Sequence, residues 1–149
     1  INIGLVSCMS YLDDKGFGPS LVHRNGVTRA RMFQEITIAQ QTDCSDDAAL
    51  AAALDQLEAT LNSPLGNMKG DYCVGQYTLA DCAWAGVCQV ATNMGKGTAV
   101  SSRSAVNTWF AAVQSHPSTS KEAINPFSCL STKADHDANS MRDVRINTA

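Results

Sequence analysis

Six cysteines and three histidines are the side chains of this 149-residue sequence best suited to nucleophilic, acid–base or metal chemistry. The cysteines are Cys8, Cys44, Cys73, Cys82, Cys88 and Cys129. No C-x-x-C spacing occurs, and no cysteine pair stands near a histidine at zinc-binding spacing. Their even number leaves a disulfide framework open, but their share is far below the ~8–10% of small disulfide scaffolds. We therefore predict reduced, mainly structural cysteines and no metal site.

The other candidate groups have structural interpretations. Ser7 and Cys8 fall inside an expected apolar helix, where no base or helix N-terminus would lower a pKa. His23 lies in a linker and is interpreted as solvated. His116 lies at the C-terminal end of a helix, where a positive charge on its imidazole would interact favourably with the helix dipole. His136 stands between two aspartates in a polar tail that would bind a metal only weakly. We predict no catalytic residue.

Composition excludes several classes of function. The sequence is 44% hydrophobic and 17% charged, which is typical of a soluble globular protein. The net charge is −3 and no Lys/Arg cluster appears, so no nucleic-acid partner is expected. The apolar runs are shorter than the ~18 residues of a membrane span. Because the sequence begins with Ile1, we expect either a piece of a longer chain or an intracellular protein that has lost a mitochondrial or plastid targeting segment.

Apolar residues recur at helical spacing along most of the chain, which predicts an all-α helical bundle. Helices are expected over residues 3–12, from a cap at Thr28 to about Thr42, from a cap at Ser45 or Asp46 to the break at residues 62–67, and over about residues 101–115. The third of these has a stripe of Leu50, Leu54, Leu57 and Leu61. The last would bury Val106, Trp109, Phe110 and Val113 and end before Pro117.

The segment GQYTLADCAWAGV, residues 75–87, marks the start of another helix. Thr78 and Asp81 have the spacing of a capping box, with Asp in place of Glu or Gln. Tyr77 precedes the cap and could pack on Cys82 as a staple. Beyond the cap the helix is apolar on two sides, with Trp84 and Met94 among the expected core positions, and it is expected to end at residues 93–97. This pattern predicts a helix in the middle of the bundle.

Three segments in order resemble the all-helical C-terminal domain of the cytosolic-type glutathione transferases. These are SCMSYLDDKGFGPSLVHRNGVTRARMFQ, GQYTLADCAWAG and VNTWFAAVQSHPS, and the resemblance covers about residues 5–123. It implies a remnant helix and linker over residues 1–19 and a helical domain over residues 20–125. After Pro126 the sequence is polar with isolated apolar residues, which predicts an extended, irregular tail over residues 126–149. The tail would either wrap the domain or dock on a partner.

The resemblance places the family's catalytic residue and its glutathione-binding cis-proline before Ile1. The family's acidic-plus-Ser pair would fall near Asn2, Ile3 and Gly4, and Ile3 offers no hydroxyl, so no glutathione ligand is assigned. In this family the helix that would carry Arg29, Arg31, Met32 and Gln34 faces the substrate cleft. These four residues are therefore expected to line an acceptor pocket or, without a thioredoxin-like half, to form a partner face.

Two functional hypotheses follow from the resemblance. The first is a non-catalytic interaction or scaffold module, an accessory subunit that binds other protein subunits and needs no cofactor. The second is the acceptor-substrate half of an active glutathione transferase, or of a related thiol-dependent dehalogenase or isomerase, with glutathione as cofactor. In the first case a partner would contact Arg29, Arg31, Met32 and Gln34, and in the second case a substrate would.

Overall fold

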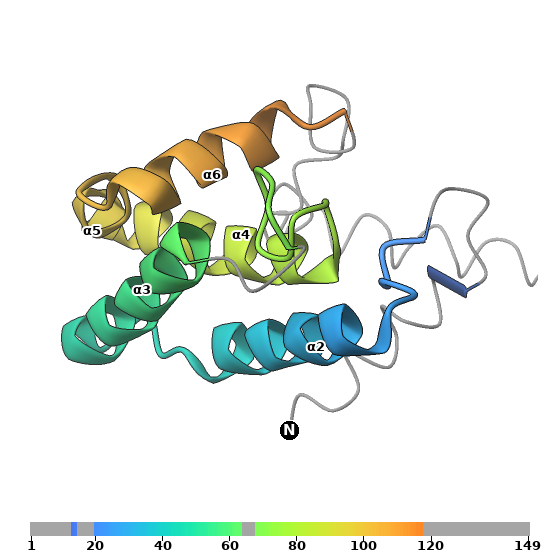
Figure 1. Cartoon of the computed structure of the whole chain (residues 1–149). Coiled ribbons are helices and arrows are strands. Elements are labelled where there is room, and N and C mark those ends of the chain that lie inside the picture. The colour runs from blue at the N-terminus through green and yellow to red at the C-terminus, as the bar shows by residue number, and fades with distance from the viewer. Residues whose placement is uncertain (1–12, 15–19, 64–67, 118–149) are drawn as a thin grey trace, which may run out of the picture. The chain divides into compact units, whose positions relative to one another are not determined.

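The computed structural model describes residues 13–14, 20–63 and 68–117, and within these ranges its regular structure is helical, as predicted (Figure 1). By its internal contacts the chain divides into two units, Ile1–Gln114 and Ser115–Ala149, and the helical bundle belongs to the first. The helix expected over residues 3–12, nearly all of the remnant segment 1–19 and the tail 126–149 lie outside the described residues.

Helix α2 spans Gly26–Gln41 and begins at a cap supplied by Asn25. Asn25 Oδ1 accepts from the N–H groups of Val27 at 3.0 Å and Thr28 at 3.2 Å. The prediction of a cap at Thr28 is therefore wrong by one helical turn. Asn is among the best N-cap residues, and Thr28 is buried instead. The expected end near Thr42 agrees with the structure.

Helix α3 spans Asp47–Asn62, and its cap is Asp46, one of the two predicted residues. Asp46 Oδ1 accepts from the N–H groups of Ala48 at 2.8 Å and Ala49 at 3.3 Å. The predicted leucine stripe faces the core: Leu50, Leu54 and Leu57 are at most 1% exposed, whereas Leu61 is half-buried.

Helix α4 spans Leu79–Ala91 and is the central helix that the sequence predicts. Each of its residues is buried or half-buried, and α2 lies alongside it (Figure 1). Trp84 on α4 and Met32 and Ile36 on α2 belong to the same hydrophobic core and are at most 1% exposed. An apolar surface of this kind stabilises the bundle by removing side chains from water.

Helix α4 ends at Ala91, and the chain kinks at Gly95, within residues 93–97 where the sequence predicts the end of the central helix. A π-helical turn, η1, spans Thr92–Lys96, and the short helix α5 follows over Gly97–Ser101. Gly95 has a φ of 80°, the left-handed region that glycine tolerates. Met94 lies in η1, beyond the last residue of α4, and is 47% exposed, so the prediction that it joins the core is wrong.

Helix α6 spans Ser104–Ser115. It begins three residues later than predicted because the residues before it form α5. Val106, Trp109 and Val113 are buried as expected. Phe110 is only half-buried and stacks on Trp109 with ring centroids 6.1 Å apart.

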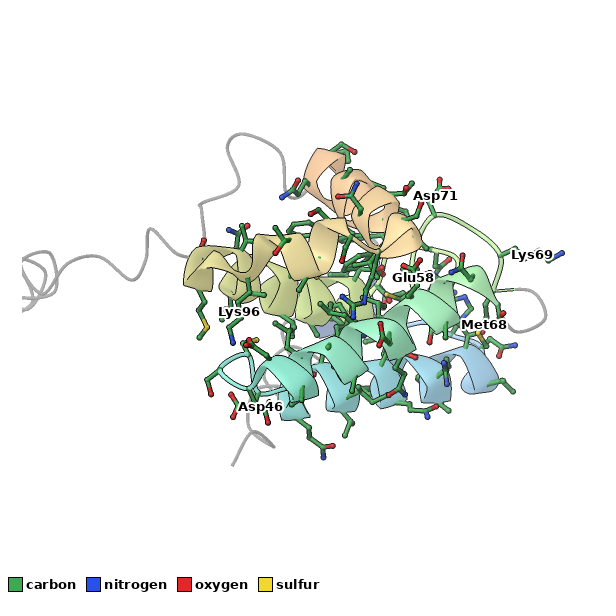
Figure 2. All side chains as sticks on the ribbon, turned by 90° about the vertical axis from the view of Figure 1, so that its left-hand side faces the viewer. Asp46, Glu58, Met68, Lys69, Asp71 and Lys96 are labelled. Atoms are coloured by element: carbon green, nitrogen blue, oxygen red, sulfur yellow. The ribbon has the colours of Figure 1, made fainter. Side chains whose placement is uncertain are left out.

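The first turn of α6 is capped by a side chain from α3. Glu58 accepts from the N–H groups of Ala105 at 3.1 Å and Val106 at 2.8 Å (Figure 2). Arg103, just before α6, donates from Nε to Asp55 at 2.7 Å and from a terminal nitrogen to the Ala51 carbonyl at 3.1 Å. Helix α3 therefore fixes where α6 begins.

The substitution Glu58→Gln tests this cap. Partial burial raises the pKa of Glu58, but the backbone donors Val106 and Ala105 outweigh it, and the pKa lies below its ordinary value of 4.5. At neutral pH the variant should lose about 1 kcal/mol of unfolding free energy, as for other N-cap losses. Because the folded-state pKa is lowered, the carboxylate's contribution is complete above the ordinary pKa and disappears as the pH falls through the folded value.

Urea denaturation of both proteins from neutral to acidic pH measures the difference. Asp71→Asn, at an exposed loop position, is the matched control and should track the wild type at every pH. A Glu58→Gln deficit that stays constant down to acidic pH would contradict the assignment.

Candidate functional site

Two carboxylates, Glu35 on α2 and Asp81 on α4, lie inside the bundle with no solvent exposure. Each accepts a hydrogen bond from a buried indole. Trp84 Nε1 donates to Glu35 Oε2 at 3.1 Å, and Trp109 Nε1 donates to Asp81 Oδ1 at 2.8 Å. These two bonds connect α2 to α4 and α4 to α6.

Asp81 closes the capping box at the start of α4, with Thr78 as the N-cap. Its Oδ2 accepts from the Thr78 N–H at 2.9 Å and from the Thr78 hydroxyl at 3.2 Å. Its Oδ1 accepts from the Cys73 N–H at 2.9 Å, in addition to the Trp109 indole. The carboxylate thus carries most of the box and also holds the preceding loop and α6.

Tyr77, the residue before the cap, lies where the sequence expects a staple. Its hydroxyl is 3.4 Å from Cys82 Sγ, so the contact with Cys82 includes a polar pair. Its ring meets that of Tyr72 edge to face, with centroids 5.4 Å apart. Both contacts orient the segment that enters α4.

Glu35 is a buried group that the sequence analysis missed. Its Oε1 lies 2.9 Å from the Arg31 guanidinium and 3.3 Å from Thr60 Oγ1. Arg31 also donates to Thr60 Oγ1 at 2.9 Å and to Gln34 Oε1 at 3.0 Å. One signal was present: Glu35 follows Met32 by three residues and Arg31 by four, which places it on the core face beside a cation.

Arg29, Arg31, Met32 and Gln34, the four residues expected to share a pocket or partner face, point in different directions. At about 100° per residue, Arg29 and Arg31 stand about 160° apart around α2. Met32 is 0% exposed and belongs to the core. Arg31 is half-buried and bound to Glu35, whereas Arg29 and Gln34 are exposed.

Besides Gly26 and Arg29, five residues of α2 are exposed, and we name these five the outer face of α2. It consists of Val27, Ala30, Gln34, Thr37 and Gln41. These positions recur at helical spacing opposite the buried stripe, and none of them is charged. Val27, at 73%, is the more exposed of the two exposed large hydrophobics in the described part of the chain.

The four cysteines in the described ranges, Cys44, Cys73, Cys82 and Cys88, are free thiols, as predicted. Burial raises the pKa of each, to about 12 for Cys88 and well above the ordinary value for Cys73. Raised pKa values keep these groups in the thiol form, which is a poor nucleophile. Cys8 and Cys129 lie outside the described residues.

Most other candidate groups are accounted for by position. His23 Nδ1 accepts from the Asn25 N–H at 3.1 Å, just before α2. His116 follows the last residue of α6. Ser7 and His136 lie outside the described residues. Within those residues no three His, Cys, Asp or Glu side chains are grouped to hold a metal ion, and no helix has the length and hydropathy needed to cross a membrane.

Comparison with known proteins adds no relative to this description. No family model matches the chain, and neither a curated protein nor a solved structure matches it. The fold and the buried groups define an all-α bundle held by carboxylate–indole pairs. The resemblance to glutathione transferases rests on the three sequence segments alone.

The substitution Asp81→Asn tests the central role of this carboxylate. An amide at this position turns an NH₂ group toward donors from Thr78, Cys73 or Trp109, leaving at least one of them without an acceptor. We expect the free energy of unfolding to fall by about 2–4 kcal/mol. Urea denaturation followed by tryptophan fluorescence measures it.

Asp71→Asn is the matched control, because Asp71 is exposed on the loop before α4 (Figure 2). It should change stability by less than about 0.5 kcal/mol. Equal stability of the two variants would show that Asp81 contributes nothing beyond a surface aspartate.

Proposed function

We propose that this chain is a non-catalytic interaction module of the glutathione-transferase C-terminal type, an accessory subunit in a larger protein assembly. The order of the helices and the Thr78–Asp81 capping box ahead of a central helix support the family type. The outer face of α2 supports the interaction role and is the observation on which the proposal depends.

The outer face of α2 has the properties of a contact surface between proteins. It extends along a 16-residue helix whose opposite side is already buried against the bundle. Its residues are small or uncharged, and Val27 offers an apolar side chain at one end. A face without charges avoids the large cost of removing a charge from water, while its Gln and Thr side chains would need hydrogen bonds from the partner. Interface cores are likewise depleted in charged residues.

The polar groups inside the bundle support a structural rather than a catalytic role. Glu35 and Asp81 each accept several hydrogen bonds from other elements, so neither is poised to move a proton to a ligand. The described thiols have raised pKa values. Free cysteines also support an intracellular, reducing compartment, a class that includes the mitochondrial matrix and the plastid stroma.

The substitution Ala30→Arg tests the outer face, because it places a charge within the proposed interface. Ala111→Arg on the exposed side of α6 is the matched control, since both are exposed helical alanines. The full chain carrying either change would be isolated from its source cells and the co-purifying subunits quantified by mass spectrometry. We expect Ala30→Arg to reduce their recovery at least about tenfold and Ala111→Arg to leave it unchanged.

Circular dichroism should show that both variants keep the helical content of the wild type. Equal recovery with both variants would overturn the proposed interface. Calorimetric titration of the full chain with glutathione provides the second readout, and no saturable binding is expected. Saturable binding would favour the alternative, in which the chain is the acceptor-substrate half of a glutathione transferase.

A further inference from the structure

Cys44 lies in the turn between α2 and α3 and approaches α4. Its sulfur is 3.9 Å from the carbonyl oxygen of Val87. In a trans peptide the carbonyl oxygen lies beside the Cα atom of the next residue, which here is Cys88. The Cys44 sulfur therefore sits against the peptide unit that carries a second, fully buried cysteine.

The turn that carries Cys44 is held in this position by Lys96 of η1. Lys96 Nζ donates to the carbonyl oxygens of Cys44 and Ser45, each at 2.8 Å, and pairs with Asp47 Oδ1 at 2.6 Å. Figure 2 shows Lys96 at the same end of the bundle as Asp46, the N-cap of α3. Two backbone contacts and one ion pair thus fix the turn against the end of α4.

The pKa values of Cys44 and Cys88 are both raised, but their surroundings differ. The pKa of Cys88 is raised to about 12, mainly by burial and further by the charge that Cys44 would carry as a thiolate. The pKa of Cys44 is raised by burial and by Asp43, but Lys96 opposes the increase. Cys44 is also the more exposed of the two, so it is the thiol that an oxidant reaches first.

We propose that Cys44 and Cys88 are a redox pair that forms an intramolecular disulfide under peroxide and fastens the α2–α3 turn to α4. Because the pKa of Cys44 is raised, excess peroxide reacts with the small fraction of this thiol that is ionised. The thiolate attacks one peroxide oxygen, the O–O bond breaks, and the displaced hydroxide takes up a proton, so that a sulfenic acid and one water result. The Cys88 sulfur then attacks the Cys44 sulfur, the S–O bond breaks and a second water leaves. Two thiols lose two electrons and two protons, and hydrogen peroxide is reduced to two waters.

The disulfide would join the α2–α3 turn covalently to α4. Without it, the contacts of Lys96 hold this turn in place. The disulfide would close a loop that contains all of α3 and the segment leading into α4. Closing such a loop restricts the unfolded chain and stabilises the folded one. This inference does not depend on the proposed partner surface, because neither cysteine belongs to the outer face of α2.

The test treats the reduced full chain with excess hydrogen peroxide, blocks the remaining thiols and maps the peptides of the monomer without reduction. The expected product is a peptide pair joined through Cys44 and Cys88, lighter by two hydrogens than the separate peptides. Cys44→Ser should abolish it, and Cys82→Ser, a half-buried cysteine on the same helix, should leave it unchanged. Sulfinic or sulfonic acid at Cys44 without a cross-link, or a disulfide made by other cysteines, would overturn the proposal.

The melting temperature gives a second readout that does not rely on a variant of the buried Cys88. Oxidised wild type should melt about 5 °C or more above its dithiothreitol-treated form, because a disulfide closing a loop of this kind stabilises by a few kcal/mol. Oxidised and reduced Cys44→Ser should melt together. An equal upward shift in wild type and Cys44→Ser would assign the effect to another group and contradict the proposed disulfide.

Discussion

The bundle depends on a single constraint, the burial of the Asp81 charge. A carboxylate removed from water is costly unless donors surround it. Here the Thr78 amide and hydroxyl, the Cys73 amide and the Trp109 indole supply those donors. They come from the loop before α4, from the start of α4 itself and from α6. The geometry of these three segments is therefore coupled, since displacing any one of them would leave a buried charge short of a partner.

Glu35 is a second buried carboxylate that needs donors from several helices. Hydrophobic burial is non-directional, so packing alone allows neighbouring helices to slide or rotate. A carboxylate bound to Trp84, Arg31 and Thr60 accepts only one arrangement of α2, α3 and α4. The two carboxylate–indole pairs thus specify the register of the helices that they join. Buried polar groups that are fully bonded contribute this kind of uniqueness to a fold.

Sequence patterns predicted the features that are encoded locally. The leucine stripe of α3, the Asp46 cap and the Thr78–Asp81 spacing depend on residues within a few positions of one another. Glu35 was missed because its partner Trp84 lies 49 residues away. The grouping of Arg29 with Gln34 came from the family resemblance, which does not take helical angle into account, and the two residues stand about 140° apart around α2. The start of α6 was misplaced because the turn at Gly95 and the short helix α5 follow from backbone choices that periodicity does not register.

The Glu58 cap has a consequence for the order in which the chain acquires its structure. A 12-residue helix such as α6 is marginal by itself in water. The acceptor for its first amides lies on α3, 47 residues earlier, so it reaches α6 only after the two segments have come together. On a growing polypeptide α3 leaves the ribosome before α6. The first turn of α6 receives its cap only when α6 docks against α3. Stable formation of α6 therefore follows the formation of α3 and depends on the contact between the two helices.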